Sequence, residues 1–139
     1  MLYVVKDFWR VLLNLLGVRD ILAIGTDHRG GFFSRLLTQR GYDVRTAADG
    51  SEGLRWMEES LPDVLLVDIF MPEQDGLETI RLVRRAFPTL PIVAMSGGGF
   101  GYRAGDILTV ARDFGAQSTF TKPFAPEALL TALQAVINR

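Results

Sequence analysis

Three chemically reactive side chains each stand at the end of a short apolar run. Asp68 closes VLLVD and enters the loop IFMPEQDG, Ser96 closes PIVAMS, and Lys122 stands near the end of STFTKP. A carboxylate can act as a nucleophile toward a phosphoryl group, and an ammonium and a hydroxyl group can hold the oxygens of the group that is transferred. If the fold brings the three together, they predict a site at which Asp68 accepts a phosphoryl group.

The apolar runs predict the strands of a parallel sheet. The run before Asp68 lacks polar alternation, which is typical of a strand covered on both faces, and the amphipathic stretches between the runs indicate repeated βα units. Ser51 is expected to be a helix N-cap, Gly41 a helix stop and Pro126 a first-turn residue. We expect strands near residues 21–24, 43–46, 64–68, 92–96 and 118–121, and helices near residues 31–40, 51–59, 77–86, 106–114 and 126–137.

The motifs resemble the receiver domain of response regulators in two-component signalling. In that family DIxMPxxDG carries the phosphoacceptor, a Ser or Thr ends the fourth strand and KPF ends the fifth; this chain has DIFMPEQDG, Ser96 and KPF. The resemblance covers residues 19–139. It implies that Asp68 is the phosphoacceptor, Ser96 the switch hydroxyl and Lys122 the amine of the site. It also implies a histidine kinase or phosphotransfer protein as partner, in the cytoplasm.

The expected fold class is therefore α/β, with five helices around a flavodoxin-like, doubly wound parallel sheet. Its five strands are expected in the order 2-1-3-4-5, and such sheets bind ligands where the first and third strands diverge. That rule places Asp68 opposite the end of the first strand.

The end of the first strand departs from the family pattern. Receivers carry two adjacent acids there that hold Mg²⁺, whereas the aligned stretch ILAIGTD has Gly25 and Thr26 at those positions. Mg²⁺ is usually held by one or two carboxylates together with waters and phosphate oxygens, so the loss should weaken its binding. Asp27 either compensates in part or caps the first helix. The expected ligands are Asp68, the backbone carbonyl of Phe70 and Asp27, of which Asp27 binds weakly or not at all. We therefore expect Mg²⁺ binding to be weak or absent.

Further departures affect the switch and the loops around the phosphoryl group. Thr119 stands where receivers usually carry a Tyr or Phe switch residue, and the neighbouring Phe120 is expected in the core because strand alternation sends it to the opposite face. Gly97 and Gly98 follow Ser96 in a glycine-rich stretch whose backbone N–H groups can cradle an anion. A loop without that role is the alternative. The bulky Phe70 is expected to flank and shield the phosphoryl group.

A second resemblance points to an enzyme. Residues 23–31, AIGTDHRGG, resemble the opening of the ribose-5-phosphate isomerase B type sugar isomerases, in which a strand leads into a GSDHAG-like loop. In that interpretation Asp27 and His28 would contact a sugar phosphate. No Cys or Glu stands beside Ser96 to act as the base, so this remains a remote alternative to the receiver.

Composition limits the other function classes. The 139 residues, 48% of them hydrophobic, are enough for one domain with a core. The net charge of -1 and the absence of Lys/Arg runs longer than two residues argue against nucleic-acid binding. The sequence has no cysteine, which excludes disulfides and thiolate chemistry.

Residues 1–18 predict an amphipathic helix that precedes the receiver domain of residues 19–139. Lys6, Arg10 and Asn14 form one polar stripe, and the other side is apolar and wide. The segment is too short and too polar to span a membrane, and it lacks a signal-peptide cleavage site. We expect it to form a homodimer, with packing on its own domain or at a membrane interface as alternatives.

The expected function is thus that of a stand-alone receiver in phosphorelay signal transduction, with Asp68 as phosphoacceptor and impaired Mg²⁺ binding. The chain is not expected to be an enzyme beyond self-catalysed phosphotransfer and dephosphorylation. The main alternative is a pseudo-receiver that binds protein partners irrespective of phosphate.

Overall fold

The computed structural model describes residues 19–25, 31–69, 75–97, 103–122 and 124–137, together with Leu15 and Gly17. Within these residues one parallel sheet has the order β2-β1-β3-β4-β5, which confirms the predicted flavodoxin-like topology. The strands are β1 (Asp20–Ile24), β2 (Asp43–Ala47), β3 (Val64–Asp68), β4 (Ile92–Ser96) and β5 (Ser118–Thr121). The helices are α2 (Phe32–Gln39), α3 (Gly50–Glu59), α4 (Asp75–Ala86), α5 (Ala104–Phe114) and α6 (Pro126–Ile137).

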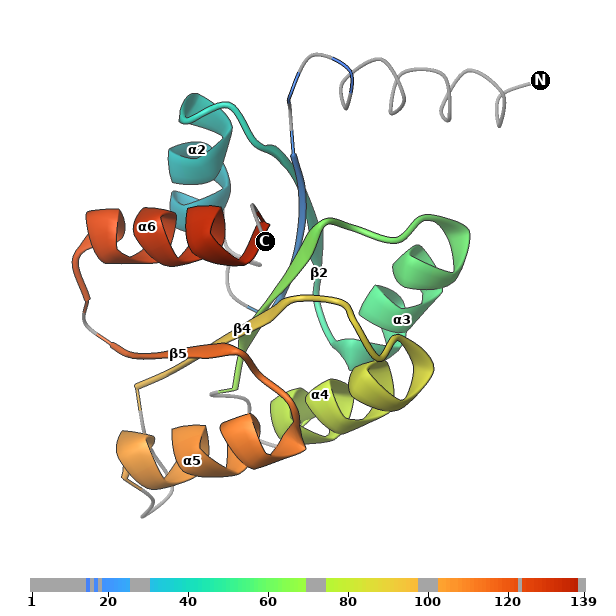
Figure 1. The fold of residues 1–139 in the computed structure, drawn as a ribbon, viewed down its shortest axis with the longest axis vertical. Helices are drawn as coiled ribbons and strands as arrows, with labels where there is room; N and C mark the ends of the chain where they lie inside the picture. Colours follow the sequence, from blue (N-terminus) through green and yellow to red (C-terminus); the bar gives the residue numbers. More distant parts are fainter. Residues whose placement is uncertain are drawn as a thin grey trace.

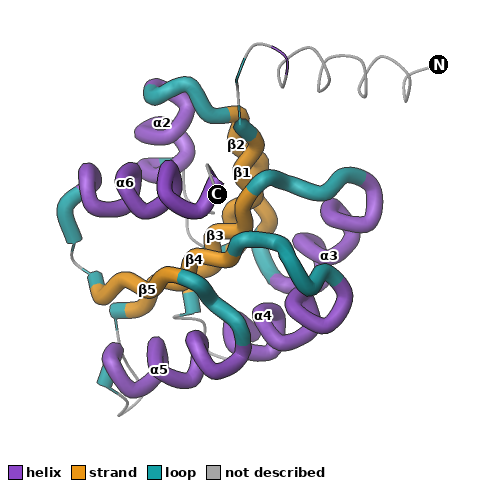
Figure 2. The backbone as a smooth tube through the Cα atoms, in the orientation of Figure 1, coloured by secondary structure: helices purple, strands orange, loops and turns teal. Residues whose placement is uncertain are grey.

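The helices cover the sheet on both faces. Helices α2 and α6 lie on one side of the sheet and α3, α4 and α5 on the other (Figure 1). The strands cross between these two layers, as the tube in Figure 2 shows. Because all strands run parallel, their carboxyl ends lie at one edge, which is where ligands bind in sheets of this type.

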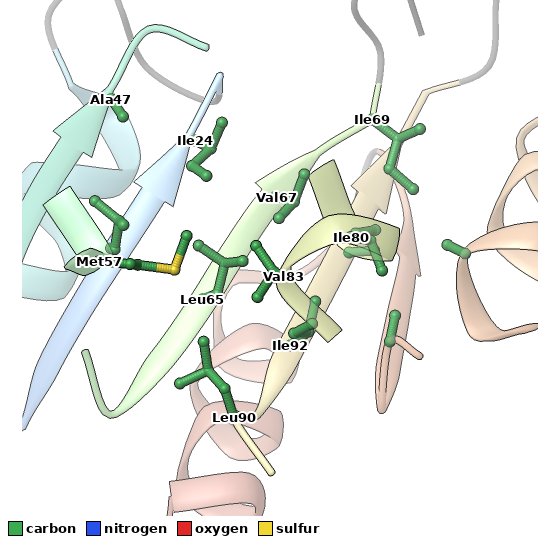
Figure 3. Packing of buried hydrophobic residues seen from close by; sticks show 14 of the residues in the cluster. Ile24, Ala47, Met57, Leu65, Val67, Ile69, Ile80, Val83, Leu90 and Ile92 are labelled. Atoms are coloured by element: carbon green, nitrogen blue, oxygen red, sulfur yellow. The ribbon is translucent and has the colours of Figure 1, made fainter. Parts of the chain in front are cut away.

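Residues that alternate along a strand enter two separate hydrophobic clusters. Leu65 and Val67 of β3 pack with residues of α3, α4 and α5 (Figure 3), whereas Val64 and Leu66 pack with residues of α2 and α6. All four side chains are fully buried. A strand covered on both faces has no side that favours polar residues, which explains why the sequence of β3 shows no alternation.

One predicted helix boundary is wrong. The N-cap of α3 is Asp49, whose carboxylate accepts a hydrogen bond of 2.9 Å from the backbone N–H of Glu52. The Glu52 carboxylate in turn accepts a bond of 3.1 Å from the N–H of Ala48, a reciprocal arrangement close to a capping box. Ser51, the expected cap, is therefore the second residue of the helix.

Other expected boundaries are confirmed. Gly41 follows the C-cap of α2 with a left-handed φ of 92°, and Pro126 is the first residue of α6. Helices α4 and α5 each begin two residues before the predicted start. Among the described residues no helix has the length and hydropathy to cross a bilayer.

Candidate functional site

The strand register brings the three predicted site residues to one edge of the sheet. Asp68 is paired with Met95 of β4, so Ser96 lies one residue further along, and Ser96 is paired with Thr121, the residue before Lys122. Three residues that lie far apart in sequence therefore come from the ends of adjacent strands. The three strand ends thus lie at one edge, and the roles of the three side chains in a common site stay a prediction.

Asp68 and Lys122 are in direct contact. The Lys122 ammonium donates a hydrogen bond of 2.6 Å from Nζ to Oδ2 of Asp68, across 54 positions of the sequence. The Asp68 side chain is 9% exposed and that of Lys122 is 31% exposed, so the carboxylate is nearly covered while part of the Lys122 side chain reaches solvent. A positive charge in this position can attract an anionic phosphodonor and stabilise the oxygens of a phosphoryl group bound to Asp68.

Ser96 and Gly97 lie against the backbone of Lys122. Ser96 is fully buried, and its carbonyl accepts a bond of 3.0 Å from the N–H of Lys122. A Cβ atom placed on Gly97 would lie 3.8 Å from the Cβ of Lys122, which is ordinary van der Waals contact. The chain after β4 and the chain after β5 are thus in contact at this edge.

The side chain of Thr119 is hydrogen-bonded to a residue of α5. Its hydroxyl accepts a hydrogen bond of 3.1 Å from Nε of Arg112, in the last turn of that helix. Sequence reasoning missed Arg112, because nothing in its neighbourhood marks it and its bond to β5 depends on how α5 packs. Phe120 points to the other face and packs against the cluster beneath α2 and α6, as expected.

Among the described residues, the position next to Asp68 at the end of β1 is a glycine. The paired residues Ile24 and Val67 are followed by Gly25 and Asp68. Gly25 has a left-handed φ of 77°, and its N–H donates a bond of 3.0 Å to the carbonyl of Ala47. Glycine adopts this backbone conformation without the steric cost that other residues bear.

The described donors do not complete a Mg²⁺ site. Among the residues that the structure describes, no group of three or more His, Cys, Asp or Glu side chains is placed to hold a metal ion. Asp68 is one suitable carboxylate, and Mg²⁺ needs further oxygen ligands in octahedral geometry. The other expected ligands, Asp27 and the carbonyl of Phe70, lie outside the described residues. So do Thr26, His28 and Gly98.

Known proteins with similar sequences are response regulators. The response regulator receiver domain model matches residues 31–134. Response regulator MprA of Mycobacterium leprae is 34% identical over 128 residues, which cover 91% of this chain and 52% of MprA. The alkaline phosphatase synthesis transcriptional regulatory protein PhoP of Bacillus subtilis is 30% identical over 103 residues, covering 74% of this chain and 41% of PhoP. The chain thus spans about half the length of the curated relatives that it matches.

Solved structures show the same fold. A putative response regulator from Chloroflexus aurantiacus has a TM-score of 0.75 at 29% identity and covers 88% of this chain and 99% of its own. A response regulator receiver domain protein from Clostridium thermocellum has a TM-score of 0.77 at 28% identity, covering 88% and 96%. Together with the contact between Asp68 and Lys122 at the carboxyl edge of the sheet, these likenesses show that the chain belongs to the response regulator receiver domain family.

Proposed function

We propose that the chain accepts a phosphoryl group on Asp68 from a histidine kinase or a phosphotransfer protein. A carboxylate oxygen of Asp68 attacks phosphorus, an O–P bond forms, and the P–N bond to the donor histidine breaks, which leaves the donor imidazole. Lys122 stabilises the charge on the phosphoryl oxygens, and the Ser96 hydroxyl binds one of them. The 2.6 Å contact between Lys122 Nζ and Asp68 Oδ2 is the observation that carries the proposal.

The chemistry of the chain is limited in this proposal to its own phosphorylation and dephosphorylation. The remote interpretation as a sugar-phosphate isomerase depends on residues 23–31, whereas the receiver model matches residues 31–134. Receiver domains of two-component systems interact with histidine kinases or phosphotransfer proteins, which makes these the proposed partners. The expected cytoplasmic location and the stand-alone character of the domain stay predictions.

Mg²⁺ binds weakly in this proposal. When bound, the cation would offset negative charge on the phosphoryl oxygens, and Asp68 is the described residue able to hold it. Gly25, which lies next to Asp68 in the register, contributes no carboxylate. This observation also favours the second candidate, a pseudo-receiver whose protein contacts do not depend on phosphate.

The deciding experiment is a mass measurement after incubation with a small-molecule phosphodonor and Mg²⁺. We expect the unmodified protein to gain one phosphoryl group, Asp68→Asn to gain none and Lys122→Ala to react much more slowly. Asp113→Asn, which alters an exposed acid on α5, is the control and should react normally.

Two outcomes would contradict the phosphoacceptor role. A gain of mass that persists in Asp68→Asn would place the phosphoryl group on another residue. No gain with any phosphodonor, while the protein still binds its partners, would favour the pseudo-receiver.

A further inference from the structure

Three aromatic rings form a continuous stack beside Lys122. The rings of Phe120 and Phe124 lie 5.1 Å apart between centroids, tilted by 45°, and those of Phe124 and Phe33 lie 6.0 Å apart, inclined by 23°. Such separations and inclinations are those of favourable aromatic pairs. The rings come from β5, from the segment after Lys122 and from α2, and Phe124 is the middle ring.

The contact between Phe120 and Phe124 brings together two residues that flank Lys122 in the sequence. Four residues of an extended strand span about 13 Å, so the 5.1 Å between the rings of Phe120 and Phe124 is far shorter than an extended course favours. Lys122 lies within this closed segment, two residues from each ring. The N–H of Lys122 is also bonded to the Ser96 carbonyl, which holds the segment against β4. The ammonium therefore extends from a backbone held on both sides.

The three rings of the stack pack against one hydrophobic cluster. All three rings are half-buried and pack against the cluster whose members Leu37, Met95 and Leu129 are fully buried. Phe33 lies in the first turn of α2, so the stack joins this helix to the backbone of Lys122. A ring with neighbours on both sides has little freedom to shift.

We infer that Phe124, held between Phe120 and Phe33, is a positioning residue that sets the direction in which Lys122 approaches Asp68. The expected effect on the rate of phosphorylation rests on the proposed function of Lys122. The expected effect on the position of Lys122 does not. A displacement of about 1 Å in a catalytic group can slow a reaction by about 100-fold. Loss of the Phe124 ring should therefore slow phosphorylation through its effect on the position of Lys122.

The test compares Phe124→Leu with two matched variants. Phe124→Tyr keeps the ring and should restore the behaviour of the unmodified protein. Phe114→Leu makes the same change in a half-buried residue that packs against the opposite cluster, and should leave the site unaffected. Phosphorylation by a small-molecule phosphodonor should slow by roughly 10- to 100-fold in Phe124→Leu and stay unchanged in the other two.

A second measurement is independent of phosphorylation. The hydrogen-bonded ammonium of Lys122 should give a protected side-chain signal in proton–nitrogen NMR spectra, and Lys6 is the other lysine of the sequence. We expect the Lys122 signal to weaken in Phe124→Leu and to persist in Phe124→Tyr and Phe114→Leu. If it weakens as predicted but the unmodified protein accepts no phosphoryl group, positioning stands and the proposed function fails.

The inference is overturned by either of two results. One is an unchanged ammonium signal in Phe124→Leu, whatever the rate of phosphorylation. The other is an equal loss of signal in Phe114→Leu, because that would show a general loosening of the fold instead of a local effect at Lys122.

Discussion

At the scale of single residues, Gly25 lies next to Asp68 in the strand register, where the resemblance to receivers predicts an acid. Its φ of 77° lies in the left-handed region, which costs a residue with a side chain about 1–2 kcal/mol. Gly25 therefore offers neither a carboxylate nor an ordinary strand conformation at the end of β1. An acid introduced at position 25 brings a charge toward Asp68 and also strains the backbone, and a test must separate the two effects.

The metal prediction uses paired variants for this reason. Gly25→Asp with Thr26→Asp should bind Mg²⁺ more tightly, and phosphorylate faster at Asp68, than Gly25→Asn with Thr26→Asn. Asparagine has nearly the same shape and tolerates left-handed φ, so the difference reports charge alone. Titration calorimetry with Mg²⁺ measures the affinity. If the unmodified protein binds Mg²⁺ as tightly as the Asp pair, Asp27 has taken over the ligand role.

Tyr42 gives a prediction about alkaline pH. Burial raises the pKa of its phenol above the ordinary value of 10.0, because the charged form is disfavoured beside the cluster that α2 and α6 cover. The unfolded chain then deprotonates first, so the contribution to stability is complete below pH 10.0 and is lost as pH rises through the folded pKa. Tyr42→Phe should remove this part of the alkaline loss. Urea unfolding on both sides of that pH checks it, and equal slopes with pH in the two proteins would contradict it.

At the scale of the elements, a side chain of α4 binds the carboxyl end of α5. Arg84 of α4 donates bonds to the carbonyls of Phe87, Pro88 and Gly115, at 3.2, 2.8 and 2.7 Å. Burial lowers the pKa of Arg84 below its ordinary value, because desolvation disfavours the charged guanidinium. A cation near the exposed carbonyls of helix ends is favourable, and here one guanidinium serves the ends of both α4 and α5.

The two glycines at the ends of α5 should respond oppositely to alanine. Gly115 has a φ of 123°, and a Cβ there would lie 2.6 Å from Nε of Arg84, so Gly115→Ala should destabilise the fold by about 1–3 kcal/mol. Gly105, in the exposed first turn, has nothing within 4 Å of an added Cβ. Gly105→Ala should therefore be neutral or stabilising by up to about 1 kcal/mol. Chemical denaturation measures both, and a shift of the same sign in the two variants would refute the argument.

At the scale of the whole molecule, the hydrophobic core and the reactive side chains occupy different parts of the sheet. Its two faces are filled by the two hydrophobic clusters, and the reactive side chains stand at one edge, where the strands end. The contact of Lys122 with Asp68 therefore depends on the parallel pairing of β3 with β4 and of β4 with β5. A domain of this kind can change its edge loops without dismantling its core.

Self-association is the prediction that belongs to this scale. Nearly all of residues 1–16 lie outside the described residues; the amphipathic helix that the sequence predicts there would have an apolar side too wide to be left in water, so we expect a homodimer that depends on this segment. Deletion of residues 1–17 should reduce the mass seen by light scattering to that of a monomer. Asn14→Ala, on the polar stripe, is the control and should leave the dimer intact. A monomer before and after deletion would rule the dimer out.

The sequence alone determined the strands and the identity of the reactive residues. Val64 to Asp68 could be read as a buried strand because a fully covered strand tolerates no polar alternation, and its five residues are indeed buried. Asp68, Ser96 and Lys122 could be named because each carries its chemistry in its own side chain and stands beside a turn motif. The apolar run and the turn motif each occupy a few neighbouring residues, so both can be recognised from the sequence alone.

Only the tertiary structure decided how these residues meet. Asp49 and Ser51 both have the chemistry of an N-cap, and the extended φ of −150° at Asp49 selects the former. The bond of Arg112 to Thr119 and the stack of Phe33 on Phe124 have no local signature, since each depends on how a helix packs against another element. The 2.6 Å between Lys122 and Asp68 joins residues 54 positions apart, and it exists because parallel strands bring their carboxyl ends to one edge.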